Sequence, residues 1–120
     1  MGGRFVHDVP RKFRNNTSDK VFREFVKGDP LQPRRLPTSW VHALGVWNSR
    51  LAGRPPSART LKVVQGDRDT TVDRNYNLRV LPTLFPRVEI TAIKGAGHQL
   101  MNELEPMRGR VLALIAGYLE

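Results

Sequence analysis

The sequence predicts an α/β protein, chiefly from the order of patterns in its second half. Residues 60–66 and 87–93 are short apolar runs, and the second is rich in β-branched side chains. A polar or glycine-containing loop and then a helix-like stretch follow each run. This order is typical of parallel strands with helices on their faces. We therefore expect two parallel strands with flanking helices, preceded by a helical segment.

Length and composition set wide bounds. The chain has 120 residues, enough for one modest domain or for part of a larger one. It has no cysteine, which excludes disulfide frameworks, thiolate nucleophiles and cysteine-based zinc sites. It has no apolar run of membrane-spanning length and no apolar signal-peptide core near its beginning. We expect a cytoplasmic protein without a transmembrane segment.

The first half divides into an irregular basic segment over residues 1–16 and a helical segment over 17–52. Thr17 or Ser18 is expected to cap a short helix that ends at Gly28. The apolar stripe of this helix consists of Val21, Phe22, Phe25 and Val26.

A second helix should follow the "LPTS" stretch, with Ser39 as its N-cap. Its apolar positions recur on one helix face and are Trp40, Ala43, Leu44, Trp47 and Leu51. The spacing of the two tryptophans first indicates core packing, and it would also suit the wall of an apolar ligand pocket. Residues 53–59 have the composition of a linker.

The second half, residues 60–120, forms the predicted α/β portion. Asp73 should cap a helix over residues 74–81, and Pro82 should end it. Residues 94–103 read as a loop. Glu105 and Pro106 should open the last helix, with proline at its first position.

The positive charge lies almost entirely in the first half. Residues 1–60 carry twelve Lys/Arg and four Asp/Glu, whereas residues 61–120 carry eight and seven. The net charge of +9 therefore divides into +8 and +1. Such asymmetry indicates either a solvated arginine-rich surface or an anionic partner. No aromatic-basic or helix-turn-helix pattern accompanies the charge, so nucleic acid is the less favoured partner.

Two loops after the predicted strands carry the candidate catalytic residues. Asp69 follows the first strand, and His98 follows the second within "KGAGHQLMNE". The carboxyl ends of parallel strands meet at one edge of a sheet, so both side chains should emerge together. A carboxylate there can orient the imidazole and leave Nε2 as a base. Asp67 and Asp73 remain alternatives to Asp69 as the acid.

The segments "LKVVQGDRDTTVD" and "IKGAGHQLMNE" resemble the C-terminal portion of the α/β-hydrolase fold, most closely the lysophospholipase and monoacylglycerol-lipase branch. In that fold the chain order is nucleophile, acid, histidine. The resemblance implies that Asp69 is the acid and His98 the catalytic base. It covers residues 60–120 well, and more loosely residues 17–52, which resemble the helical cap of the family.

The sequence departs from the family at the nucleophile. The family places it in G-x-S-x-G at a strand-to-helix turn, and the oxyanion loop lies further upstream. None of the four serines has this context, namely Ser18, Ser39, Ser49 and Ser57. The oxyanion loop is also absent from the 120 residues. The chain therefore resembles a C-terminal fragment made of the cap and the last two strands.

The implied activity is hydrolysis of carboxylic esters, chiefly acyl lipids, by the complete enzyme. The isolated chain should be inactive because it lacks the serine. Trp40 and Trp47 are the candidate substrate-binding residues. We expect no cofactor, and no metal because His7, His42 and His98 share no ligand spacing. An anionic lipid surface and self-association of the chain are further expected contacts. The alternative is a non-enzymatic basic module that binds nucleic acid or anionic membrane through residues 1–60.

Overall fold

A computed structural model describes residues 7–119 of the chain. Four α-helices, a short 3₁₀ helix and four strands lie within these residues. In chain order they are β1 (Asp8–Pro10), α1 (Lys20–Gly28), β2 (Arg35–Pro37), α2 (Thr38–Ala52), β3 (Leu61–Gly66), α3 (Arg74–Leu84), β4 (Val88–Ile93), η1 (Leu100–Asn102) and α4 (Met107–Gly117).

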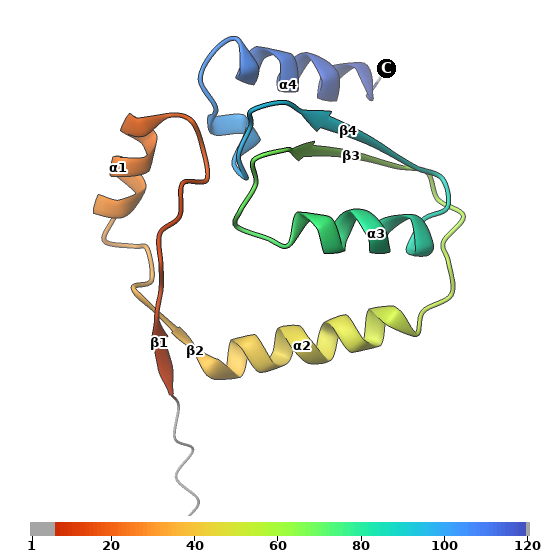
Figure 1. Cartoon of the computed structure of the whole chain (residues 1–120), viewed down its shortest axis with the longest axis horizontal. Coiled ribbons are helices and arrows are strands. Elements are labelled where there is room, and N and C mark those ends of the chain that lie inside the picture. Colours follow the sequence, from red (N-terminus) through yellow and green to blue (C-terminus); the bar gives the residue numbers. More distant parts are fainter. Residues whose placement is uncertain (1–6, 120) are drawn as a thin grey trace, which may run out of the picture.

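The second half of the chain forms the expected parallel pair of strands. β3 and β4 run parallel, with Leu61 opposite Val88 and Gly66 opposite Ile93. The crossover helix α3 lies on one side of the pair and α4 on the other (Figure 1). The α/β class is therefore confirmed, with two parallel strands and flanking helices.

The alternation of side chains along β3 explains this layering. Val64 packs against the small buried core, which α4 helps to form. Val63 and Gln65 point to the other side and line a cavity together with residues of α3. The strand thus has apolar side chains on both faces, as expected for a strand covered by helices on both sides.

The start of α3 was predicted correctly from the sequence, but its end was not. Asp73 caps the helix, and its side chain accepts a hydrogen bond from the Tyr76 amide at 2.9 Å. The helix then continues through Pro82 to Leu84, so the prediction that Pro82 ends it is wrong. Proline lacks the amide that would donate to the Leu78 carbonyl, but the residues around it still close the last turn, where the Phe85 amide donates to the Leu81 carbonyl at 2.8 Å.

Both helices predicted in the first half are present, but their capping residues differ from the prediction. The Asp19 side chain caps α1 by accepting from the Phe22 amide at 3.0 Å, so Thr17 and Ser18 are not its caps. α2 begins one residue after Pro37 and has no side-chain cap, which makes the assignment of Ser39 as N-cap wrong. α4 begins at Met107, directly after Pro106.

A short antiparallel ladder between β1 and β2 was not predicted. It pairs Asp8 with Pro37, Val9 with Leu36 and Pro10 with Arg35. Residues 7–16 of the predicted irregular segment therefore contain a strand, while residues 1–6 lie outside the described residues. The ladder fixes the start of α2 next to the N-terminal segment, as Figure 1 shows.

The hydrophobic core is small. Within residues 7–119 the buried apolar residues are Ile93, Ala96 and Val111, and no residue of α1, α2 or α3 is buried. Trp40 and Trp47 are 56% and 55% exposed, so the expectation that they pack in a core is wrong. α2 has only sparse contacts with the rest of the chain, and its apolar residues have too few neighbours to be covered.

The total solvent-accessible surface is large for a chain of this size. The chain exposes 9363 Å². A compact protein of 13.6 kDa would expose about 6,600 Å². No helix among the described residues is long and apolar enough to cross a bilayer. Exposed large apolar side chains on the helices include Val21, Phe25, Trp40 and Leu112.

We predict that the isolated chain self-associates at micromolar concentrations, because association is the available way to remove this apolar surface from water. Sedimentation velocity should show species heavier than 13.6 kDa. Replacing both Trp40 and Trp47 with serine should shift the distribution towards the monomer. A monodisperse monomer with one sharp, reversible unfolding transition would contradict the prediction.

Candidate active site

The carboxyl ends of β3 and β4 hold two loops against each other. The Asp67 amide donates to the Ile93 carbonyl at 3.2 Å, and the Arg68 amide donates to the Ala96 carbonyl at 2.9 Å. A Cβ atom at Gly66 would lie 2.1 Å from the Gly97 carbonyl oxygen, so only glycine permits this approach. The backbone alone therefore brings the Asp69 loop and the His98 loop into contact.

The turn before His98 has its own fixed geometry. Gly95 has a φ of +84°, a conformation that glycine adopts without strain. Its amide donates to the Asp67 carboxylate at 2.7 Å. Asp67 thus orders the turn, and it is not the partner of the histidine, as one of the alternatives had it.

Asp69 is the carboxylate that His98 contacts. The distance between His98 Nδ1 and Asp69 Oδ2 is 2.9 Å. The same carboxylate accepts from the Gln65 side-chain amide at 3.0 Å and from the Thr71 backbone amide at 2.8 Å. The structure therefore brings together the two residues that the sequence proposed as acid and base, although they are 29 positions apart.

The pKa of Asp69 is lowered from its usual value. Burial opposes ionisation and raises the pKa, but the hydrogen bonds from His98, Thr71 and Gln65 together outweigh it. Asp69 is therefore ionised at neutral pH and can only accept hydrogen bonds. It follows that Nδ1 of His98 carries the proton and that Nε2 of the neutral ring has a free lone pair.

The two members of the pair differ in exposure. The Asp69 side chain is 2% exposed, whereas the His98 side chain is 39% exposed. Nε2 of His98 makes no hydrogen bond to any residue in the described range of the chain. The arrangement is a buried anion that orients a solvent-accessible base, which is the geometry that general base catalysis requires.

A second buried carboxylate holds the His98 loop from behind. Glu103 is 1% exposed and accepts from the Gly97 amide at 2.6 Å. Its other oxygen accepts from the Ser18 amide at 2.7 Å and from the hydroxyl groups of Ser18 and Thr17. Glu103 therefore anchors the backbone of the His98 loop at Gly97.

The N-terminal segment also holds the His98 loop in place. The Gln99 amide donates to the Asn16 carbonyl at 2.8 Å, and a Cβ atom at Gly97 would lie 2.5 Å from that same oxygen. Thr17 is buried and donates to the Asn102 carbonyl at 2.5 Å. Sequence reasoning missed this part of the site, because no local pattern links Thr17 and Ser18 to a glutamate about 85 positions away.

The pKa of Glu103 is also lowered. Burial raises it, and the hydrogen bonds from Ser18, Gly97 and Thr17 lower it by more. An ionised carboxylate with four donors holds two distant segments together more firmly than neutral groups would. The position of His98 therefore depends on Glu103 as well as on Asp69.

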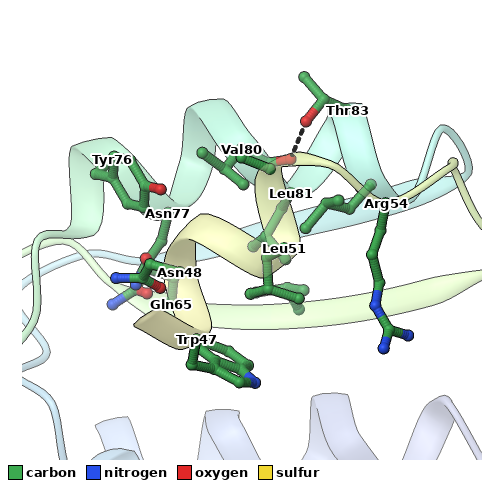
Figure 2. Close-up of a pocket in the computed structure, with 13 residues that line it drawn as sticks. Trp47, Asn48, Leu51, Arg54, Gln65, Tyr76, Asn77, Val80, Leu81 and Thr83 are labelled. Carbon is green, nitrogen blue, oxygen red and sulfur yellow. Dashed lines mark hydrogen bonds between the residues drawn. The ribbon is translucent and has the colours of Figure 1, made fainter. Parts of the chain in front are cut away.

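The two candidate substrate-binding tryptophans lie in different places. Trp47 lines a cavity of about 640 Å³ between α2, α3 and β3. Trp40 lines a separate groove next to the N-terminal segment. Figure 2 shows the Leu51 side chain of α2 beneath Leu81 of α3, with Gln65 of β3 below Asn77. Gln65 connects this cavity to the site because its amide also donates to Asp69.

The serines do not supply a nucleophile in this structure. Ser18 binds Glu103, and the Ser49 hydroxyl donates to the Gly45 carbonyl of its own helix at 3.1 Å. Ser39 lies in α2, and Ser57 precedes β3. Across residues 7–119 no serine hydroxyl forms a hydrogen bond with His98.

Comparison of the chain with models of known protein families and with curated proteins found no match.

We predict that His98→Ala raises the pKa of the Asp69 carboxyl, because the substitution removes a hydrogen bond that favours the ionised form. The ¹³C NMR titration midpoint of this carboxyl should lie below 3.8 in the unmodified chain and move upward in the variant. The matched control is His42→Ala in α2.

The lowered pKa of Asp69 also sets the direction in which stability changes with pH. A folded-state pKa below the unfolded one gives stability that is present above the unfolded pKa of about 3.9 and is lost as pH falls through the folded pKa. The Asp69 loop should therefore loosen only in acid. An unchanged midpoint in His98→Ala would show that the contact with His98 does not form in solution.

We predict that Glu103→Gln loosens the His98 loop, since the amide replaces an accepting oxygen with a donor that faces other donors. Hydrogen exchange of the Gly97 amide should accelerate about ten- to hundredfold, the loss expected for a buried charged hydrogen bond. The control is Glu105→Gln, an exposed carboxylate bonded to Arg108. Equal exchange rates in both variants would contradict the anchoring role.

Proposed function

We propose that this chain carries the acid and the base of a serine hydrolase of the α/β-hydrolase type, which acts on carboxylic esters of acyl lipids. The observation that carries the proposal is the 2.9 Å contact between His98 Nδ1 and Asp69 Oδ2 at the ends of two adjacent parallel strands. The order of acid before histidine along the chain supports the same assignment.

In the proposed reaction His98 Nε2 takes the proton of a serine hydroxyl while the serine oxygen attacks the ester carbonyl. The imidazolium then returns the proton to the leaving alcohol, and water repeats the cycle on the acyl-enzyme. Asp69 keeps its negative charge throughout, orients the ring and stabilises the imidazolium. The lowered pKa of Asp69 supports this role because it keeps the carboxylate ionised.

The serine and the oxyanion donors belong to a part of the protein outside these 120 residues. The large exposed surface supports this interpretation, because α1 and α2 leave apolar residues such as Phe25 and Trp40 uncovered. In the absence of that part, acyl transfer lacks both its nucleophile and the stabilisation of the tetrahedral intermediate. We therefore expect the isolated 120-residue chain to be inactive towards esters.

Apolar side chains close to the pair support an acyl substrate. The cavity between α2 and α3 is lined by Trp47, Leu51, Val80 and Leu81 and reaches Gln65, which bonds to Asp69. Its volume of about 640 Å³ lies within the range of small-molecule sites. An acyl chain in this cavity would lie one side chain away from the catalytic carboxylate.

The test begins with the coding DNA upstream of residue 1. We expect a continuous reading frame that encodes a G-x-S-x-G segment. The protein made from that frame should hydrolyse p-nitrophenyl butyrate and react with a fluorophosphonate at the serine. His98→Ala should reduce both rates by a factor of 10³ or more, the order of magnitude for loss of a triad member.

His42→Ala should leave both rates unchanged, as a control for histidine substitution in general. A frame without such a serine would overturn the proposal. Hydrolysis that survives His98→Ala would overturn it as well, because the base would then lie elsewhere.

A further inference from the structure

Two adjoining grooves beside the Asp69 loop have linings rich in cations. The first is lined by residues from the N-terminal segment, α1 and α2, and the second by the N-terminal segment and the Asp69 loop. They share Lys12, Phe13 and Arg14, and we call them together the basic groove. Its cations are Arg11, Lys12, Arg14, Arg23, Lys27 and Arg68, and no carboxylate lines it.

Few of these charges are neutralised. Lys27 pairs with Glu24 at 2.7 Å on the surface of α1. Lys12, Arg14, Arg23 and Arg68 form no salt bridge with any residue between 7 and 119. Cations that gather without counter-charges repel one another and raise the local positive potential, so binding of an anion there is favoured.

Some of the groove is already fixed in place. Arg14 Nη1 donates to the Thr70 carbonyl at 2.8 Å, and Arg11 donates to the Gln32 side chain at 2.8 Å while it stacks on the Phe13 ring. Two arginine stems are thus held by contacts other than carboxylates. Their remaining donors are available to a ligand, and ordering them costs less entropy than ordering free side chains.

The basic groove adjoins the catalytic pair. Arg68 and Thr70 of the second groove flank Asp69 in the sequence, and Thr71 of the first donates its amide to the Asp69 carboxylate. On the other side, Asn16 lines the first groove and accepts from the Gln99 amide next to His98. A ligand in the groove therefore lies beside both loops of the site.

The rest of the lining is apolar. Phe13, Val26, Leu36 and Trp40 belong to the first groove, and Trp40 is 56% exposed. A ligand that matches this lining has an anionic group for the cations and a short apolar portion for these side chains. Arginine forks and several cations suit the multiple oxygens and double charge of a phosphate group better than a single carboxylate.

We infer that the basic groove binds the phosphate group of an amphiphilic ligand. This inference does not depend on the proposed function. Lys12, Arg14 and Arg68 contact the phosphate, and Trp40 contacts the apolar portion.

The test measures binding and needs no nucleophile. In a Trp47→Phe background Trp40 is the single tryptophan, because the sequence has two. Its fluorescence is titrated at low ionic strength with inorganic phosphate, with hexyl phosphate and with hexanoate. We expect hexyl phosphate to bind most tightly, since it alone supplies both a phosphate and an apolar chain.

Arg68→Gln and Lys12→Gln should each weaken binding of hexyl phosphate about tenfold, the effect of losing one charge-assisted contact. Arg68→Lys should retain part of the affinity. Arg79→Gln on α3 and Arg110→Gln on α4 are matched controls for net charge and should bind as the parent does. Both control residues are exposed and lie outside the groove lining.

The other outcomes distinguish between possible sources of the phosphate group. They also distinguish a failure of this inference from a failure of the proposed function. Equal affinity for inorganic phosphate and hexyl phosphate would remove the amphiphile and overturn the inference. Binding only to phosphatidylglycerol vesicles, or much tighter binding to a single-stranded oligonucleotide with a steep salt dependence, would also overturn it and favour a basic surface module. If the protein made from the longer reading frame hydrolysed no ester while hexyl phosphate binding stayed intact, the proposed function alone would be overturned.

Discussion

The parallel, in-register pairing of β3 with β4 is the constraint on which the candidate site depends. Gly66 lies opposite Ile93, so the two strands end at the same level and their loops begin side by side. A shift of the register by two residues would move one loop by about 7 Å along the sheet. Asp69 and His98 could not then form their 2.9 Å contact. The pairing of the two strands thus sets the positions of the Asp69 and His98 loops relative to each other.

Glu103 adds a second constraint that the strands cannot provide. The His98 loop leaves β4 with two glycines, whose flexibility would otherwise allow many conformations. A buried carboxylate must be satisfied by donors, because an unpaired charge in the interior is costly. Gly97, Ser18 and Thr17 supply those donors, so the loop and the N-terminal segment have one favourable arrangement. Asp69 orients the imidazole, and Glu103 fixes the backbone that carries it.

Whether an interaction could be predicted from the sequence depends on how far apart its residues lie along the chain. Strand and helix periodicity are local, and they located β3, β4 and the pair Asp69 and His98. Capping is not decided by neighbouring residues alone: Asp19 caps α1, whereas Thr17 and Ser18 are engaged with the distant Glu103. The β1–β2 ladder and the Glu103 contacts join segments far apart in the chain, and no local pattern encodes them.

The two unusual properties of the first half have a common structural origin. Its positive charge and its exposed apolar residues both lie in a segment that is attached to the α/β portion chiefly through Asn16, Thr17, Ser18 and the loops they contact. A segment held at one place leaves its remaining surface free for other contacts. In this chain that surface combines cations with Trp40 and reaches Thr71 of the Asp69 loop, and the proposed amphiphilic anion would bind there. The same attachment thus positions His98 and directs the charge of the first half towards it.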